Sequence, residues 1–230
     1  MSYRDAKQLQ ETLKRELWSE ARVWMQERAQ TLWNGGLSDE VAALYSEFAR
    51  GPGIQELVGS SVVQSAVKMT LLTFLRVGSL APTKWDEFDF KKGVWTIPGS
   101  RMKAKQDHHF PIANQINDLL ESLRRVNGDQ EYVFYSPRGR TKSHINPAVI
   151  NTFLIRIGYK GLLTAHGIRA IPLTMGQEVL GFDSEIIQRQ LAHAIGDKVR
   201  QAYDRSQFCE ERKKFMIAWC DALTAEGLRT

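Results

Sequence analysis

The chain has 230 residues, of which 43% are hydrophobic and 25% are charged, so a packed globular domain is expected and a disordered chain is not. The sequence has no run of about 18 apolar residues, so no membrane span is predicted. The charged N-terminus lacks the apolar core of a secretory signal. The formal net charge of +5 and the pI of about 9.2 favour a polyanionic partner, although proteins without one can be equally basic. The two cysteines, Cys209 and Cys220, fall on one predicted helix roughly 16 Å apart, too far for a disulfide, which favours a reducing, cytoplasmic location.

The first part of the chain predicts two helices followed by a strong break. Residues 4–33 carry apolar side chains at helical spacing, and a shorter helix is predicted from Ser38 to about Arg50. Gly51-Pro52-Gly53 then interrupts the pattern. We therefore expect a short helical N-terminal region over residues 1–53 and a larger domain over residues 54–230.

The larger domain begins with a predicted buried helix from Ser60 to Leu75. After it, the spacing of apolar residues changes from helical to the alternation typical of strands. Short β-type runs at Phe88 to Phe90, Val94 to Ile97 and His109 to Ile112 predict a small antiparallel sheet. Helical spacing returns in later segments, at residues 116–126, 147–157, 167–180, 185–192 and 208–223. The predicted fold class is mainly α with a small antiparallel β-sheet inserted (α+β).

Several common functional motifs are absent from the sequence. There is no glycine-rich phosphate-binding loop, no dinucleotide fingerprint and no G-x-S-x-G. The cysteines and histidines do not have zinc-site spacing, and His108-His109 has no carboxylate close enough in sequence to suggest a metal site. Neither a metal nor a cofactor is expected.

A set of residues suited to phosphate chemistry remains, in a definite order along the chain. These residues are Arg76, Lys103, His166, Arg169, His193 and Tyr203. Arginine can donate two parallel hydrogen bonds to phosphate oxygens, and fixed cations stabilise the charge that grows there in a transition state. Taken singly, each residue also has an ordinary structural interpretation, such as a helix cap, a solvated loop lysine or a half-buried aromatic. The functional interpretation rests on all of them occurring together.

That order is the basis of a family resemblance. The segments LLTFLRVGSL, WDEFDFKKGVWTIPGSRMKAKQDHHFPI, TAHGIRA, IIQRQLAHAIGDKVRQAYDR and EERKKFMIAWCDAL closely resemble the catalytic domain of tyrosine recombinases, especially the integrases of P4-like phages and genomic islands. The resemblance extends from Thr73 to Leu223. It implies site-specific DNA cleavage and rejoining through a covalent 3′-phosphotyrosine, without a cofactor.

The resemblance also implies a role for each residue. Tyr203 matches the nucleophile, and Arg76 and Arg169 match the two phosphate clamps. His193 matches a third donor to the phosphoryl oxygens, and Lys103 matches the general acid for the leaving 5′-oxygen. His166 matches the residue that assists proton transfer at the tyrosine. Expected partners are double-stranded DNA attachment sites and, for some members, accessory DNA-bending proteins.

The last predicted helix carries Phe215, Trp219 and Leu223 on one face. Two interpretations stay open: the helix packs on its own domain, or it joins neighbouring protomers in a homo-tetramer on DNA, as the resemblance implies.

Two departures from the family pattern bear on activity. Ser79 stands where members usually carry a carboxylate that supports the first arginine. Residues 1–53 are also much shorter than the usual core-binding domain, so either the sequence is shortened or the protein holds DNA with part of a clamp. Two alternatives to an integrase therefore stay open: a relaxase or type IB topoisomerase-like cleavage without strand exchange, and a non-catalytic DNA-binding regulator derived from a recombinase.

Overall fold

The computed structural model describes residues 61–137, 143–193, 208–225, 228 and 230. The predicted N-terminal helices, the break at Gly53 and Tyr203 lie outside the described residues, as does the segment 138–142. None of the helices in the described part is both long and apolar enough to cross a membrane.

The predicted antiparallel sheet is confirmed. It has three strands in the order β1-β2-β3, formed by Phe88–Asp89, Val94–Ile97 and His108–Pro111. Trp95 pairs with Phe88 on one side and with Phe110 on the other, and its ring centroid lies 5.0 and 5.8 Å from theirs. This aromatic row is buried. It gives the sheet one apolar face, as the alternation of residues along β2 predicts.

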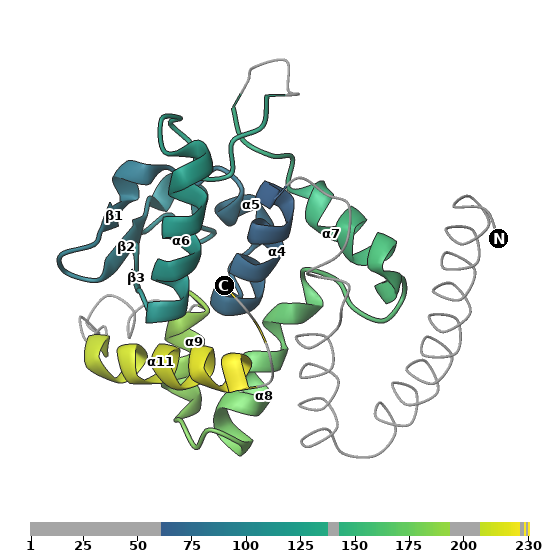
Figure 1. Cartoon of the computed structure of the whole chain (residues 1–230). Helices are drawn as coiled ribbons and strands as arrows, with labels where there is room; N and C mark the ends of the chain where they lie inside the picture. The colour runs from purple at the N-terminus through teal and green to yellow at the C-terminus, as the bar shows by residue number, and fades with distance from the viewer. Residues whose placement is uncertain (1–60, 138–142, 194–207, 226–227, 229) are drawn as a thin grey trace.

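Outside the sheet, the described part of the domain is mainly helical, as predicted. The first described helices are α4, Ser61–Thr73, and α5, Val77–Leu80. They are followed by α6, Asn114–Asn127, and by α7, Ala148–Leu154, which continues into a π-type turn at Ile155–Tyr159. In Figure 1, α4 lies at the centre, α6 beside it next to the sheet, and α7 on the opposite side.

The sequence predicts a helix over residues 167–180, in which we expect Pro172 to disturb the first turn or shift its start, and the structure confirms that expectation. A short 3₁₀ turn, η4 (Gly167–Arg169), comes first, and α8 (Ile171–Glu178) follows with Pro172 in its first turn. Proline has no amide hydrogen to donate, so the helix starts around Pro172. Helix α9, Ser184–Gln190, then packs on α8.

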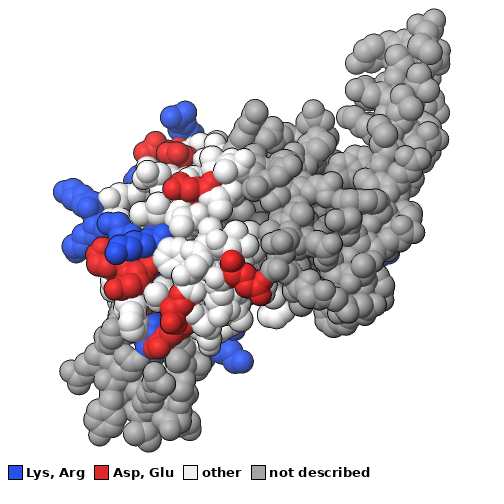
Figure 2. Space-filling model, turned by 90° about the horizontal axis from the view of Figure 1, so that it is seen from below, with Lys and Arg blue, Asp and Glu red and all other residues white. Residues whose placement is uncertain are grey.

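The C-terminal helix packs on its own domain. Helix α11, Cys209–Ala225, crosses below α4 and α6 and contacts α9 and β3. Phe215, Trp219 and Leu223 are at most 2% exposed, so the chain itself covers this face. Seen from below in Figure 2, the described surface shows acidic and basic side chains interspersed, so the basic pI does not produce a single positive field there.

Candidate active site

Arg76 lies in the turn between α4 and α5. The backbone turns sharply because Phe74 has a φ of 44°. Residues other than glycine rarely adopt this left-handed backbone conformation. The Phe74 ring is buried 6.1 Å from the Phe215 ring and 5.6 Å from the Trp219 ring. This packing offsets a backbone cost of about 1–2 kcal/mol. The half-buried Arg76 is thereby placed at the N-cap of α5.

Arg169 is a buried cation that joins two helix ends. Its side chain donates through Nη1 to the carbonyl of Phe74, after α4, and through Nη2 to the carbonyl of Leu191 at 2.8 Å, after α9. Burial, and then the positive charge of Arg76, lowers the pKa of Arg169 to about 10. That pKa still leaves the guanidinium charged at pH 7.

His193 follows directly on the end of α9. Ala192 adopts a φ of 52°, and the amide of His193 donates to the carbonyl of Gln188 at 2.9 Å. This bond from the sixth residue back to the first is typical of a helix that ends in a left-handed residue. Because the carbonyl of Leu191 holds Arg169, the same turn places His193 close to that arginine.

Lys103 is exposed on the loop between β2 and β3, and the backbone before it is anchored. Met102 is 5% exposed, and its amide donates to the carbonyl of Gly99 at 3.0 Å. The amide of Gly99 in turn donates to Oδ1 of Asp107 at 2.7 Å, across the loop. Lys103 itself is solvated, as the ordinary structural interpretation of a loop lysine has it, while Met102 and Gly99 fix the backbone at the base of the loop.

The charges of these residues converge on His193. Partial burial lowers the pKa of His193, and the positive charges of Arg169, Arg76 and Lys103 lower it further, in that order. Such charge effects act over several ångströms, so the four residues occupy one region. The causes that shift the pKa values of His193 and Arg169 are burial and neighbouring positive charge, with no carboxylate among them. A group of cations arranged in this way suits an anion.

Of the two remaining predicted residues, His166 is described by the structure and Tyr203 is not. His166 is exposed, and its carbonyl accepts a hydrogen bond from the amide of Arg169 at 3.1 Å, one turn later. Tyr203 lies outside the described residues, in the segment between α9 and α11. The predicted roles of all six residues stay predictions.

The structure adds a buried polar cluster that the sequence did not predict. Arg212, on α11, is 4% exposed and donates to Oε1 of Gln190 at 2.7 Å and to the carbonyl of His109 at 2.6 Å. His108 is buried beside it, and burial, followed by the positive charge of Arg212, lowers the pKa of His108 to about 3. The cluster joins α9 and α11, the described helices before and after Tyr203 in the sequence, to β3.

A weak signal for Arg212 exists in the sequence. The run EERKKF reads as a solvated helix start, yet Arg212 precedes Phe215 by three residues and Trp219 by seven. That spacing places Arg212 on the apolar face of the helix. Among residues 61–137, 143–193 and 208–225, no three His, Cys, Asp or Glu side chains are grouped so as to hold a metal ion.

Comparison with known proteins identifies relatives of the chain. The model of the phage integrase family matches residues 38–210. The prophage integrase IntA of Escherichia coli K12 is 37% identical over 155 residues, which cover 67% of this chain and 37% of the relative. The integrase of Enterobacteria phage P4 is 35% identical over 184 residues, covering 72% of this chain and 41% of that protein. The chain therefore spans well under half the length of either relative.

Solved structures with low sequence identity share the fold. The integrase from mycobacterium phage Brujita has a TM-score of 0.54 at 16% identity, covering 76% of this chain and 59% of the other. A lambda integrase tetramer bound to a Holliday junction has a TM-score of 0.50 at 16% identity, covering 73% of this chain and 47% of the other. These matches confirm the predicted mainly α fold with its small sheet.

Proposed function

The chain belongs to the phage integrase family, and on that premise we propose that it is a tyrosine recombinase that cleaves and rejoins DNA at specific sites. The observation that carries the proposal is the convergence of Arg76, Lys103 and Arg169 on His193. These side chains include no anionic group, and a phosphodiester bound in that region would supply the negative charge that balances them.

In the proposed reaction, the phenolic oxygen of Tyr203 attacks phosphorus and the bond from phosphorus to the 5′-oxygen breaks. Arg76 and Arg169 donate hydrogen bonds to the non-bridging oxygens, where charge grows in the transition state. Lys103 gives a proton to the leaving 5′-oxygen, and His166 assists removal of the phenolic proton. The 3′-phosphotyrosine bond preserves the energy of the phosphodiester, so a second 5′-hydroxyl can reverse the step without a nucleotide cofactor.

His193 has a specific place in this scheme. Its lowered pKa favours the neutral ring at pH 7 in the DNA-free protein, and a neutral imidazole still offers one N–H to a phosphoryl oxygen. A bound phosphate adds negative charge beside the ring and raises that pKa. The histidine is therefore expected to gain positive character as the transition state forms.

The proposed partners are double-stranded DNA attachment sites and further copies of the chain. The structure of lambda integrase similar to this chain is a tetramer bound to a Holliday junction, which supports assembly on DNA. Since Phe215, Trp219 and Leu223 are covered within the chain, contact through the C-terminal helix would use its outer side, where Ile217 is 43% exposed.

A nicked suicide duplex carrying the attachment site tests the chemistry, because loss of the short strand after cleavage traps the covalent complex. We expect a covalent protein–DNA band from the unaltered chain and from Tyr135→Phe, a control that removes a phenol elsewhere. Tyr203→Phe should give none. A duplex that is bound but never cleaved would favour the non-catalytic regulator. Resealing without joining to a second duplex would favour a topoisomerase-like activity.

A further inference from the structure

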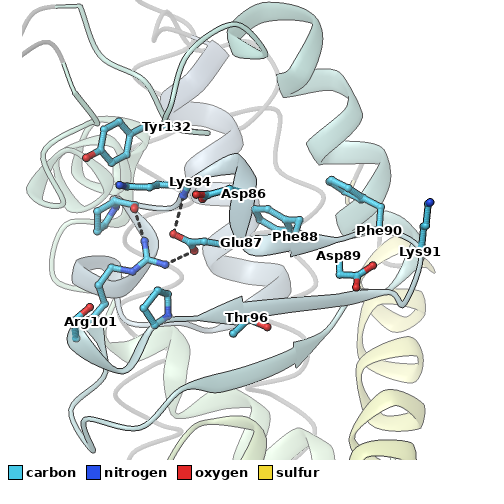
Figure 3. Close-up of a pocket in the computed structure, with 13 residues that line it drawn as sticks. Lys84, Asp86, Glu87, Phe88, Asp89, Phe90, Lys91, Thr96, Arg101 and Tyr132 are labelled. Carbon is cyan, nitrogen blue, oxygen red and sulfur yellow. Dashed lines mark hydrogen bonds and ion pairs between the residues drawn. The ribbon is translucent and has the colours of Figure 1, made fainter.

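Arg101, two residues before Lys103, is held in place by an ion pair with Glu87. The two side chains are 14% and 7% exposed. The Arg101 guanidinium donates through Nη2 to the Glu87 carboxylate and through Nη1 to the carbonyl of Pro82, as the dashed lines in Figure 3 show. Its charge is therefore neutralised within the protein, so Arg101 is poorly suited to bind a DNA phosphate.

Glu87 is itself fixed from two further directions. The buried indole of Trp95 donates to Oε2 of Glu87 at 3.0 Å, and the amide of Lys84 donates to Oε1 at 3.0 Å. Both carboxylate oxygens thus have partners in the core of the sheet or in the turn before β1. Arg101 is consequently attached to a rigid acceptor.

The backbone of Arg101 makes a second connection, to the helix that Arg76 caps. Its carbonyl accepts a hydrogen bond from Oγ of Ser79 at 2.9 Å. Ser79 is 5% exposed and lies in α5. In the family pattern a carboxylate occupies this position behind the first arginine, whereas here a hydroxyl links α5 to the loop of Lys103.

The loop itself is compact enough to transmit this anchoring. Arg101 ends the 3₁₀ turn η2, Gly99–Arg101. A Cβ on Gly99 would lie 2.8 Å from the backbone carbonyl of Lys105, so the two sides of the loop touch. An open groove of about 990 Å³ borders the ion pair on its outer side, and none of the five proposed site residues that the structure describes lines it.

We propose that Arg101 is a positioning residue which, through Glu87 and Ser79, fixes Lys103 relative to Arg76. The inference rests on the proposed function, since it assigns the anchoring to a general acid. Arg101 acts on DNA cleavage only through the placement of the Lys103 ammonium, and it does not contact the phosphate. A displacement of about 1 Å in such a group can lower a rate about a hundredfold.

The test compares two leaving groups in single-turnover cleavage of the suicide duplex. One duplex has the natural 5′-oxygen at the scissile phosphate, and the other has a bridging 5′-sulfur. A thiol has a pKa of about 8.5, far below that of an alcohol, so a thiolate leaves without a proton from a general acid. Lys103→Ala is the reference, expected to fail with oxygen and to recover with sulfur.

Glu87→Gln should lower the cleavage rate of the oxygen duplex about tenfold to a hundredfold and that of the sulfur duplex less than threefold, with DNA affinity unchanged. Ser79→Ala, a milder change that preserves the ion pair, should show the same pattern at smaller amplitude. Asp86→Asn is the matched control, because it removes a neighbouring exposed carboxylate on the same groove, and it should cleave both duplexes normally.

The positioning role is overturned if Glu87→Gln and Ser79→Ala lower the cleavage rate equally on both duplexes, or if weaker DNA binding explains the lower rate. Either result leaves the recombinase proposal intact. If the unaltered chain forms no covalent complex with either duplex, the proposed function fails and the positioning role fails with it. If Lys103→Ala is not recovered by sulfur, the general-acid assignment is wrong and Arg101 has no acid to position.

Discussion

Acidification should destabilise the folded protein through His108. The pKa of this buried ring is about 3, lowered by burial and then by the charge of Arg212, whereas an unfolded histidine titrates near 6.5. Between these values the unfolded chain binds a proton that the folded chain does not. The free energy of unfolding therefore falls as the pH drops from about 6.5 toward about 3.

The magnitude follows from the two pKa values. With a folded value of about 3 and an unfolded value of about 6.5, His108 alone removes about 2 kcal/mol between pH 7 and pH 5. Urea unfolding at the two pH values measures this loss. In His108→Gln, which keeps a polar side chain of similar reach, the loss between the two pH values should shrink by about 2 kcal/mol.

His109→Gln is the matched control, since it removes an exposed ring from the same strand. It should retain the acid sensitivity of the unaltered chain. If His108→Gln and the unaltered chain lose the same stability between pH 7 and pH 5, His108 is not the source of the acid sensitivity. In that case the ring would be protonated in the folded state, and the polar cluster would have to accept a second buried charge.

Three further outcomes are expected. Arg169→Lys should lose at least about a hundredfold in covalent-complex formation, because a single ammonium nitrogen cannot replace the planar fork whose two terminal nitrogens hold separate carbonyls. Arg212→Met should lower the free energy of unfolding by about 3 kcal/mol in urea titrations, since buried acceptors lose their donor, whereas the exposed Lys213→Met should change it little. Gly99→Ala should slow cleavage about tenfold because a Cβ meets the opposite side of the loop; Gly78→Ala, with open space around its Cβ, should not.

The elements with a strong repeating pattern were predicted well from the sequence. The strands around Trp95 and the helices α4, α6, α9 and α11 follow from alternation or from helical spacing of apolar residues. Short α5 was missed because a few residues carry no period, whereas the later start of α8 follows from Pro172. The left-handed conformations of Phe74 and Ala192 were also unpredictable, since neither residue type favours them and only the tertiary packing stabilises them.

For the candidate site, the sequence predicted a set of residues whose roles stay predictions, and it missed how those residues are held. Arg169 was predicted as a phosphate clamp, but its bonds to two backbone carbonyls depend on helix ends far apart in the chain. The sequence makes no prediction for Arg101 or Arg212, because a basic residue in a charged run normally lies in water. Their burial depends on acceptors in other segments, which a local pattern does not encode.

The arrangement of the arginines explains how the proposed site can hold a cation before any anion binds. Burying a guanidinium with no acceptor is costly, and here two carbonyls that already end α4 and α9 supply acceptors for Arg169. Each terminal nitrogen of a guanidinium carries two hydrogens, so one on each remains available after these bonds form. The protein thus fixes the orientation of the cation without neutralising its charge. Arg101 shows the opposite arrangement, in which a carboxylate cancels the charge, and this contrast separates a residue suited to bind phosphate from one suited to hold the loop that approaches it.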